Sequence, residues 1–149
     1  MEGHIKPIGG EFWFQSSVLD SNQDNFKGLN AVFLSGGQDA LRFIIEDISF
    51  ENDEYILMPS YLCPTILHNF KRKNINFIFY EIDEELSINL KDIENKINNY
   101  KVKAVFFIDY FGFYHNDNTI DFLKKLQRKG VILIEDAVQM LWFSKKKSL

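Results

Sequence analysis

The run Val-Ile-Leu-Ile at residues 131–134 narrows the possible folds of this chain more than any other segment. Four branched apolar residues in a row are typical of a strand that is buried on both faces, as in parallel sheets. Glu135 and Asp136 follow directly, which places them at the carboxyl end of the strand, where open α/β sheets bind ligands. Because a buried carboxylate is costly without a positive partner, the sequence predicts a cationic partner for Asp136.

Short apolar runs alternate with segments of helical periodicity along most of the chain. The expected strands are residues 31–34, 54–58, 76–82, 104–108 and 131–134. The expected helices are residues 40–48, 64–72, 90–98 and 120–126. This order predicts a three-layer α/β/α fold with a mainly parallel sheet, because each parallel connection needs a crossover segment.

Length and charge limit the function classes. A chain of 149 residues suits one domain, and we expect an N-terminal arm at 1–30, a main domain at 31–141 and a tail at 142–149. The net charge of −4 offers no basic footprint for nucleic acid. No apolar run is long enough to cross a bilayer, and the start lacks a signal-peptide pattern, so we expect a cytoplasmic protein.

Single titratable and aromatic residues give weaker signals. Cys63 is the one cysteine, which excludes an internal disulfide and a cysteine-rich metal site, and we expect it to be packed rather than nucleophilic. The histidines His4, His68 and His115 lack the spacing of metal ligands, so we expect them on the surface or at helix ends. Tyr61 can line a pocket, although a buried aromatic residue is the more common outcome.

The segment Ser35-Gly36-Gly37-Gln38 lies between an expected strand and an expected helix. Glycines let the backbone approach a ligand, and the free N–H groups of a helix start favour an anion, so this turn can cradle a phosphate. An ordinary tight turn explains the same residues equally well. The segment is not a Walker A loop, because Gly-Lys-Ser/Thr does not follow, and it lacks the third glycine of a dinucleotide fingerprint.

Glu135 and Asp136 also allow more than one interpretation. The pair can coordinate the metal ion of a nucleotide hydrolase, although the missing Walker A loop argues against this. It can belong to a receiver-type acidic pocket, which Asp109 at the end of the fourth expected strand supports. Asp136 can also cap a helix. Its position at a strand end favours a functional role.

Five motifs occur in order at residues 36–41 (Gly-Gly-Gln-Asp-Ala-Leu), 56–61 (Ile-Leu-Met-Pro-Ser-Tyr), 79–83 (Phe-Tyr-Glu-Ile-Asp), 109–112 (Asp-Tyr-Phe-Gly) and 134–139 (Ile-Glu-Asp-Ala-Val-Gln). In this order and at these intervals they resemble the N-terminal part of the DegT/DnrJ/EryC1/StrS sugar aminotransferase family. Its members are pyridoxal-phosphate enzymes of the aspartate aminotransferase fold (type I). The resemblance implies an incomplete large domain of a PLP-dependent transferase.

The resemblance also implies a site for pyridoxal 5'-phosphate (PLP) and assigns residues to it. Asp136 matches the aspartate that holds the protonated pyridine nitrogen, so the ring would be the cationic partner of this carboxylate. Gln139 matches a second cofactor contact in the same motif. Gly37 and Gln38 match the phosphate-binding turn. Cys63 falls where the family often has an aromatic residue stacked on the ring, and a thiol would stack poorly there.

Other features depart from the family pattern. Asp109 stands where many members have a histidine. The lysine that carries the cofactor in the family lies well beyond Gln139, after further strands, so we expect no catalytic residue in this chain. The run Lys145-Lys146-Lys147 is expected to stay solvated rather than to take that role. Residues 31–34 would also lose their family neighbours in the sheet, which leaves unpaired edges.

These features predict a fragment or truncated product of a PLP-dependent aminotransferase. The implied full-length reaction moves an amino group from a donor such as glutamate to a nucleotide-linked keto-sugar, in a homodimer. The chain alone is expected to be inactive and to bind PLP weakly or not at all. Two alternatives stay open. One is a stand-alone receiver-like or flavodoxin-like binding module that uses the strand-end acids, and the other is a pseudoenzyme half that pairs through Phe12-Trp13-Phe14.

Overall fold

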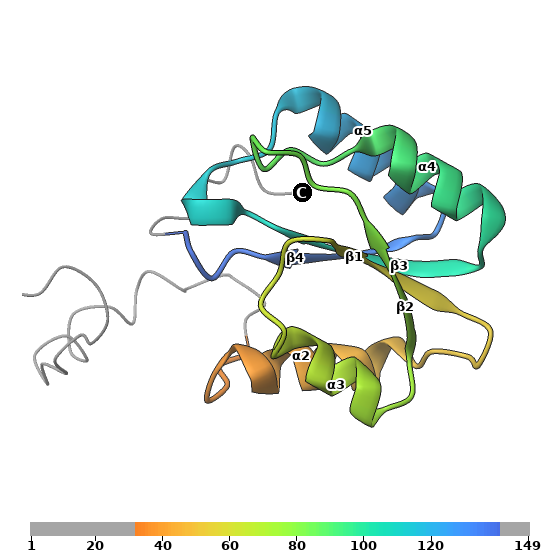
Figure 1. The fold of residues 1–149 in the computed structure, drawn as a ribbon. Coiled ribbons are helices and arrows are strands. Elements are labelled where there is room, and N and C mark those ends of the chain that lie inside the picture. The colour runs from red at the N-terminus through yellow and green to blue at the C-terminus, as the bar shows by residue number, and fades with distance from the viewer. Residues whose placement is uncertain (1–31, 141–149) are drawn as a thin grey trace, which may run out of the picture. The chain divides into compact units, whose positions relative to one another are not determined.

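The computed structural model describes residues 32–140. The chain divides into two units, Met1–Phe33 and Leu34–Leu149, and every helix and strand described here belongs to the second. The expected arm at 1–30 and tail at 142–149 lie outside the described residues, as does the Phe-Trp-Phe cluster, so that division of the chain stays a prediction. The elements, labelled as in Figure 1, are α2 (Gly37–Ile48), β1 (Tyr55–Pro59), α3 (Ile66–Arg72), β2 (Asn76–Tyr80), α4 (Leu90–Asn99), β3 (Val102–Ile108), the 3-10 turn η2 (Tyr110–Gly112), α5 (Asp117–Arg128) and β4 (Ile132–Asp136).

The described strands form a four-stranded sheet in the order β2-β1-β3-β4, and all neighbours run parallel. Helices α2 and α3 cover one face of the sheet, and α4 and α5 cover the other (Figure 1). Parallel neighbours require crossover connections, and the helices between successive strands provide them. The predicted α/β class and its three layers are confirmed.

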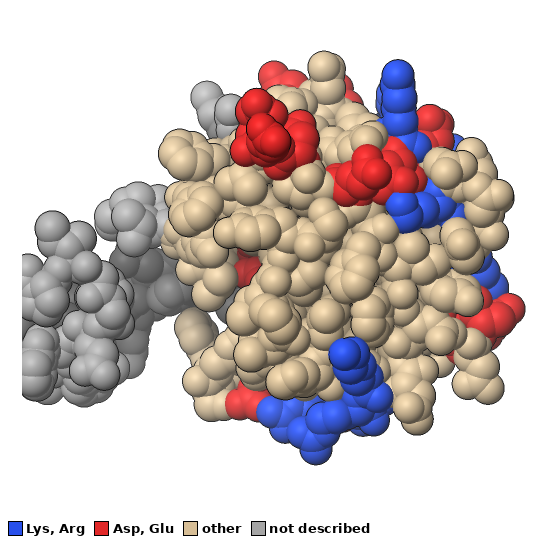
Figure 2. Space-filling model, viewed as in Figure 1, with Lys and Arg blue, Asp and Glu red and all other residues tan. Residues whose placement is uncertain are grey.

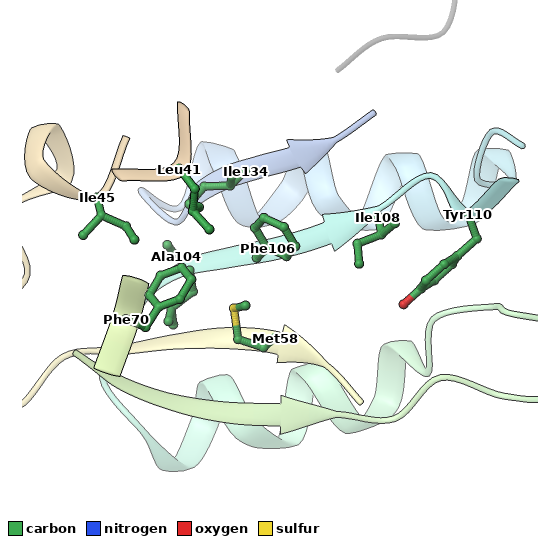
Figure 3. Close-up of a cluster of buried hydrophobic side chains, with 10 residues drawn as sticks. Leu41, Ile45, Met58, Phe70, Ala104, Phe106, Ile108, Tyr110 and Ile134 are labelled. Carbon is green, nitrogen blue, oxygen red and sulfur yellow. The ribbon is translucent and has the colours of Figure 1, made fainter. Parts of the chain in front are cut away.

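The central strands β1 and β3 are buried on both faces of the sheet. On one face, Met58 and Phe106 belong to an apolar cluster with Leu41 of α2 (Figure 3). On the other face, Phe107 belongs to a second cluster with Leu123 of α5. Alternate residues of each strand therefore enter opposite clusters, which explains why central parallel strands have continuous rather than alternating apolar sequences.

Residues 32–34 form no strand, which corrects the expectation of a first strand at 31–34. The side chains of Val32 and Phe33 are 66% and 73% exposed. The apolar run is the same as in a buried strand, but a strand also needs a neighbour that pairs its backbone N–H and C=O groups. Within the described residues, the sheet ends at β2 and β4.

Most other elements begin and end within a few residues of the expected positions. Helix α3 starts at Ile66, two residues after the expected Pro64. Helix α5 starts after Asn116, whose side chain accepts a hydrogen bond from the Thr119 N–H at 3.0 Å and so caps the helix. After α5, Gly130 has φ of +91°, a conformation that glycine commonly adopts just past the end of a helix.

On the face of the molecule that Figure 2 shows, the charged side chains lie mainly over the helices. Figure 2 shows acidic residues and some basic ones toward the top of the view, where Figure 1 places α4 and α5. Basic residues gather toward the bottom, over α2 and α3, and a largely uncharged band separates the two regions. No helix among residues 32–140 combines the length and the apolar character needed to cross a membrane.

Candidate functional site

A cavity of about 660 Å³ lies at the carboxyl ends of β1, β3 and β4, beside the first turn of α2. In the order β2-β1-β3-β4, the chain adds β2 on one side of β1 and then β3 on the other side. The point between β1 and β3 is therefore where the order in which strands are added switches sides. Open α/β sheets bind ligands at switch points of this kind. The volume also lies in the range of small-molecule and cofactor sites.

The five residues expected at a cofactor all line this cavity, namely Gly37, Gln38, Cys63, Asp136 and Gln139. They come from the start of α2, the loop after β1 and the segment after β4. These segments are far apart in the sequence, and the parallel sheet brings them to one edge. The contact of each residue with a ligand stays a prediction.

Asp136 ends β4 and lies beside the end of β3, where Ile108 is its register partner. Its backbone carbonyl accepts a hydrogen bond from the Asp109 N–H at 3.0 Å. Its carboxylate Oδ1 accepts one from the Val138 N–H at 3.1 Å, and a turn follows at residues 138–139. The carboxylate therefore orders a turn, as aspartate commonly does, and the helix-cap interpretation is wrong.

The first turn of α2 forms another part of the cavity wall. The Asp39 N–H donates to the Gly36 carbonyl at 3.1 Å, and no side chain hydrogen bond caps the helix at Gly36. The side chain of Asp39 is paired with Arg42 on the exposed side of the helix. The N–H groups of Gly37 and Gln38 thus belong to an uncapped helix start, which carries partial positive charge and favours an anion.

The side chain of Gln38 is held by α3 and does not face an anion. Asn69, which is 5% exposed, donates from Nδ2 to Gln38 Oε1 at 2.7 Å and to the Gln38 carbonyl at 3.3 Å. Gln38 Nε2 in turn donates to Thr65 Oγ1 at 3.4 Å. The side chain of Gln38 therefore joins α2 to the start of α3, and its backbone N–H is left as its contribution to the helix start.

The loop after β1 contributes Cys63 and Tyr61 to the cavity. Cys63 is exposed, so the expectation of a packed residue is wrong. Tyr61 is 57% exposed, so the buried alternative is wrong, and its place on the cavity wall agrees with the pocket-lining alternative. The Cys63 Sγ lies 3.1 Å from Thr65 Oγ1, and hydrogen bonds from Thr65 lower the pKa of the thiol. Tyr61 lies 5.6 Å from Tyr110, ring centre to ring centre, and the Tyr110 hydroxyl donates to its carbonyl.

The motif Asp-Tyr-Phe-Gly packs closely against the segment after β4. The Phe111 N–H donates to Gln139 Oε1. Gly112 has φ of +79°, and a Cβ there would lie 2.8 Å from the Gln139 carbonyl oxygen. Only glycine fits such a position without strain. The sequence analysis did not predict this contact, although Phe111, Gly112 and Gln139 lie in the motifs that carry the family resemblance.

Asp109 follows β3, and at 1% exposure it is buried behind the cavity. Burial, the hydrogen bond and charge of Glu135, and the charge of Asp136 together raise the pKa of its carboxyl from 3.8 to about 7. His115 approaches it, with Nε2 3.6 Å from Asp109 Oδ1. His115 directly precedes Asn116, the N-cap of α5, which agrees with the expected helix-end position. Its side chain is only 8% exposed, so the surface alternative is wrong. Among residues 32–140, no group of three or more His, Cys, Asp or Glu is placed to hold a metal ion.

Comparisons with known proteins identify the family. The model of the DegT/DnrJ/EryC1/StrS aminotransferase family matches residues 23–144. No curated protein matches the sequence. Among solved structures, a DegT DnrJ EryC1 StrS aminotransferase from Brucella abortus is 20% identical with a TM-score of 0.65, and the match covers 86% of this chain and 36% of that one. NtdA from Bacillus subtilis, with bound cofactor PMP, is 20% identical with a TM-score of 0.61, and the match covers 74% and 25%. DesV of S. venezuelae is 21% identical with a TM-score of 0.58, and the match covers 70% and 28%.

These solved structures show the shared fold, and this chain spans between 25% and 36% of their length. The family match covers most of the chain and includes every cavity-lining residue expected at a cofactor. It agrees with the resemblance that the five ordered motifs predict. The chain belongs to the DegT/DnrJ/EryC1/StrS aminotransferase family.

Proposed function

We propose that the cavity at the ends of β1, β3 and β4 is a PLP site, and that Asp136 holds the ring nitrogen of the cofactor. The observation that carries this proposal is the placement of a fixed carboxylate and an uncapped helix start on the wall of one cavity. A pyridinium ring that bears a phosphate has a cationic end and an anionic end. The cavity offers a suitable partner for each.

The residues present fit such a ligand at both ends. Asp136 has Oδ1 tied to the Val138 N–H, so the carboxylate has a fixed direction and can keep a proton on the ring nitrogen. The N–H groups of Gly37 and Gln38 would receive the phosphate. When bound, PLP supplies an electron sink for carbanion chemistry.

Two further contacts follow from the same geometry. Gln139 uses Oε1 to accept from the Phe111 N–H, so its Nε2 is the group that would donate to a cofactor oxygen. Tyr61 supplies the aromatic surface that Cys63 lacks, because it lines the same cavity and its backbone is anchored by the Tyr110 hydroxyl. We propose that Tyr61, rather than Cys63, packs against the ring.

We propose that the activity of the complete enzyme is amino transfer from a donor such as glutamate to a nucleotide-linked keto-sugar, in a cytoplasmic homodimer. Family membership supports this proposal. The chain spans between 25% and 36% of the length of the solved neighbours. We infer that transfer requires the further strands that those longer chains carry. The 149-residue chain by itself then binds PLP non-covalently and does not transfer amino groups.

A titration of the chain with PLP, followed by the absorbance and circular dichroism of the cofactor, tests the site. Wild type should bind saturably, and Asp136→Asn should weaken binding by about tenfold or more, which corresponds to at least about 1.4 kcal/mol of lost interaction. Asp121→Asn removes an exposed carboxylate from α5 and is the matched control, which should bind as wild type does. Equal binding by wild type and Asp136→Asn would refute the role of Asp136.

Borohydride reduction tests the mode of binding. Peptide mapping of the reduced PLP-treated chain should find no lysine that carries the cofactor. Specific labelling of one lysine would contradict non-covalent binding, and amino transfer by this chain alone would contradict the need for further strands. A Tyr61→Ala variant should weaken PLP binding more than Tyr61→Phe, because the phenylalanine keeps the aromatic surface.

A further inference from the structure

Two buried polar atoms behind the cavity lack hydrogen-bond partners among the described residues. They are Oδ2 of Asp109 and Nε2 of His115. The side chains are 2% and 8% exposed, and Nε2 lies 3.6 Å from Oδ1 of the same aspartate. Buried polar groups are nearly always paired, because an unsatisfied one costs the free energy of removing it from water. The close approach of two such groups therefore calls for an explanation.

The hydrogen bond made by the other ring nitrogen, Nδ1, determines whether Nε2 of His115 must accept or donate a hydrogen bond. The backbone of Ile108 acts on the imidazole as a hydrogen-bond partner. Since Nε2 has no partner among the described residues, we assign Nδ1 as the donor to the Ile108 carbonyl. In a neutral ring with hydrogen on Nδ1, the Nε2 atom is an acceptor. The ring of Phe107 lies edge-on to His115 at 5.7 Å and offers no polar hydrogen. The Asp109 carboxyl, whose Oδ1 lies 3.6 Å from Nε2, can supply one when it is protonated.

The surroundings of Asp109 favour its neutral form. Glu135 and Asp136 of β4 are the charged groups that act on it, and both carry negative charge, so they oppose its ionisation. Among the described residues, no lysine or arginine forms an ion pair with Asp109, and His115 is its only basic neighbour at ion-pair distance. Protonation of Asp109 removes the buried negative charge that Glu135 and Asp136 oppose. It also provides a donor for the unpaired Nε2 of His115.

We propose that Asp109 and His115 hold one proton between them at neutral pH and act as an uncharged positioning pair behind Asp136. The backbone connects the pair to the cavity, since the Asp109 N–H donates to the Asp136 carbonyl at 3.0 Å and Ile108 is the register partner of Asp136. Loss of the proton at alkaline pH leaves a buried negative charge next to two further carboxylates. This charge loosens the ends of β3 and β4 and disturbs Asp136. The cavity part of this inference rests on the proposed PLP site, whereas the shared proton does not.

NMR of the full chain tests the shared proton without any cofactor. The ¹³C signal of the Asp109 carboxyl should titrate near neutral pH, and the ¹⁵N signals of His115 should report hydrogen on Nδ1 and an accepting Nε2. Titration of Asp109 below pH 5, or hydrogen on Nε2 in the neutral ring, would overturn the proposal. Glu135 is the competing acceptor for the same proton. His115→Phe distinguishes the two acceptors, because it should move the Asp109 midpoint by about one pH unit or more if the proton is shared with His115. An unchanged midpoint assigns the proton to Glu135 and overturns the pair.

The effect on the cavity is tested by PLP binding across pH. Asp109→Asn supplies an uncharged donor to His115 Nε2, so it should preserve the Nδ1–H form of His115. Its PLP affinity should fall less above pH 7 than that of wild type, with Asp121→Asn as the control for ionisation of the cofactor itself. Identical pH profiles for wild type and Asp109→Asn would overturn the link to the cavity. If neither protein binds PLP at any pH, the proposed function fails, while the NMR titration still decides whether the proton is shared.

Discussion

Replacing Asp109 by Asn should stabilise the fold at alkaline pH. Burial and two neighbouring carboxylates raise the pKa of this residue from 3.8 to about 7 in the folded chain. A pKa that is raised by folding means that the full stability is present below about pH 4 and is lost as the pH rises to 7. At 1.36 kcal/mol per pH unit, the total loss is about 4 kcal/mol, of which about 2.5 kcal/mol falls between pH 5 and pH 8. These figures are upper values, because the charge of the exposed Glu135 is screened by salt.

Urea unfolding at pH 5 and pH 8 measures this effect in wild type and Asp109→Asn. Between these pH values, wild type should lose up to about 2.5 kcal/mol more free energy of unfolding than the variant. His115 has the opposite sign, because burial lowers its pKa from 6.5. Its contribution is full above pH 6.5 and is lost as the pH falls. Since both proteins contain this histidine, the difference between them reports mainly on Asp109.

The exposed variant Asp121→Asn controls for the general effect of removing a carboxylate. It should follow the wild-type pH dependence closely. If wild type and Asp109→Asn lose the same free energy of unfolding between pH 5 and pH 8, then folding does not raise the pKa of Asp109, and its carboxyl is ionised in the folded chain over this range. The assignment of a buried neutral acid would then be wrong.

Three other substitutions probe the packing around the site by urea unfolding. Tyr80→Phe should cost about 1 kcal/mol, because the buried Tyr80 hydroxyl donates to the Phe106 carbonyl at 3.0 Å; an unchanged stability would show that this bond has no net value. Leu123→Ala should cost about 2 to 5 kcal/mol of stability, because this side chain is fully buried in the cluster that includes Phe107 of β3 and Ile93 of α4. A loss well below that range would mean that neighbouring side chains move in to fill the space that the mutation leaves. Gly112→Ala should cost about 1 kcal/mol or more and should also weaken PLP binding, because its Cβ would meet the Gln139 carbonyl at 2.8 Å; normal binding would show that Gln139 is not a cofactor contact.

Strand and helix patterning predicts most of this fold because the central strands are buried on both faces. The runs around Met58 and Phe106 are continuous and apolar, as expected for such strands. The run at residues 31–34 has the same composition and yet forms no strand over its described residues. Composition reports whether a segment suits burial, whereas pairing depends on neighbours elsewhere in the chain. A local pattern cannot provide that information.

Strand order alone does not separate the two leading interpretations of the sequence. The order β2-β1-β3-β4 also occurs in flavodoxin-like and receiver-like folds. Both would place acids at the ends of β3 and β4, as Asp109 and Asp136 are placed here. The ordered series of motifs distinguishes the family, and the family match agrees with it.

The positions that sequence reasoning placed wrongly depend on loops. Cys63 and Tyr61 lie in an irregular segment after β1, where no periodicity indicates which side chain faces the core. His115 lies at a helix end, as one of its two alternatives has it. Its side chain is buried because the loop before α5 brings it back to the end of β3, near the Ile108 backbone. Spacing rules for metal ligands and helix ends carry no information about such a return.

The hydrogen bonds of Gln38 link two walls of the cavity. Asn69 of α3 donates a hydrogen bond to this side chain. The side chain in turn donates to Thr65, whose hydroxyl also contacts the thiol of Cys63. The start of α2 and the loop after β1 are therefore connected through one side chain. Asn69 does not line the cavity. A substitution of Asn69 would nevertheless alter the distance between the phosphate end and the ring end of the proposed site. Substitutions at this position can therefore change ligand affinity without replacing a residue that contacts the ligand.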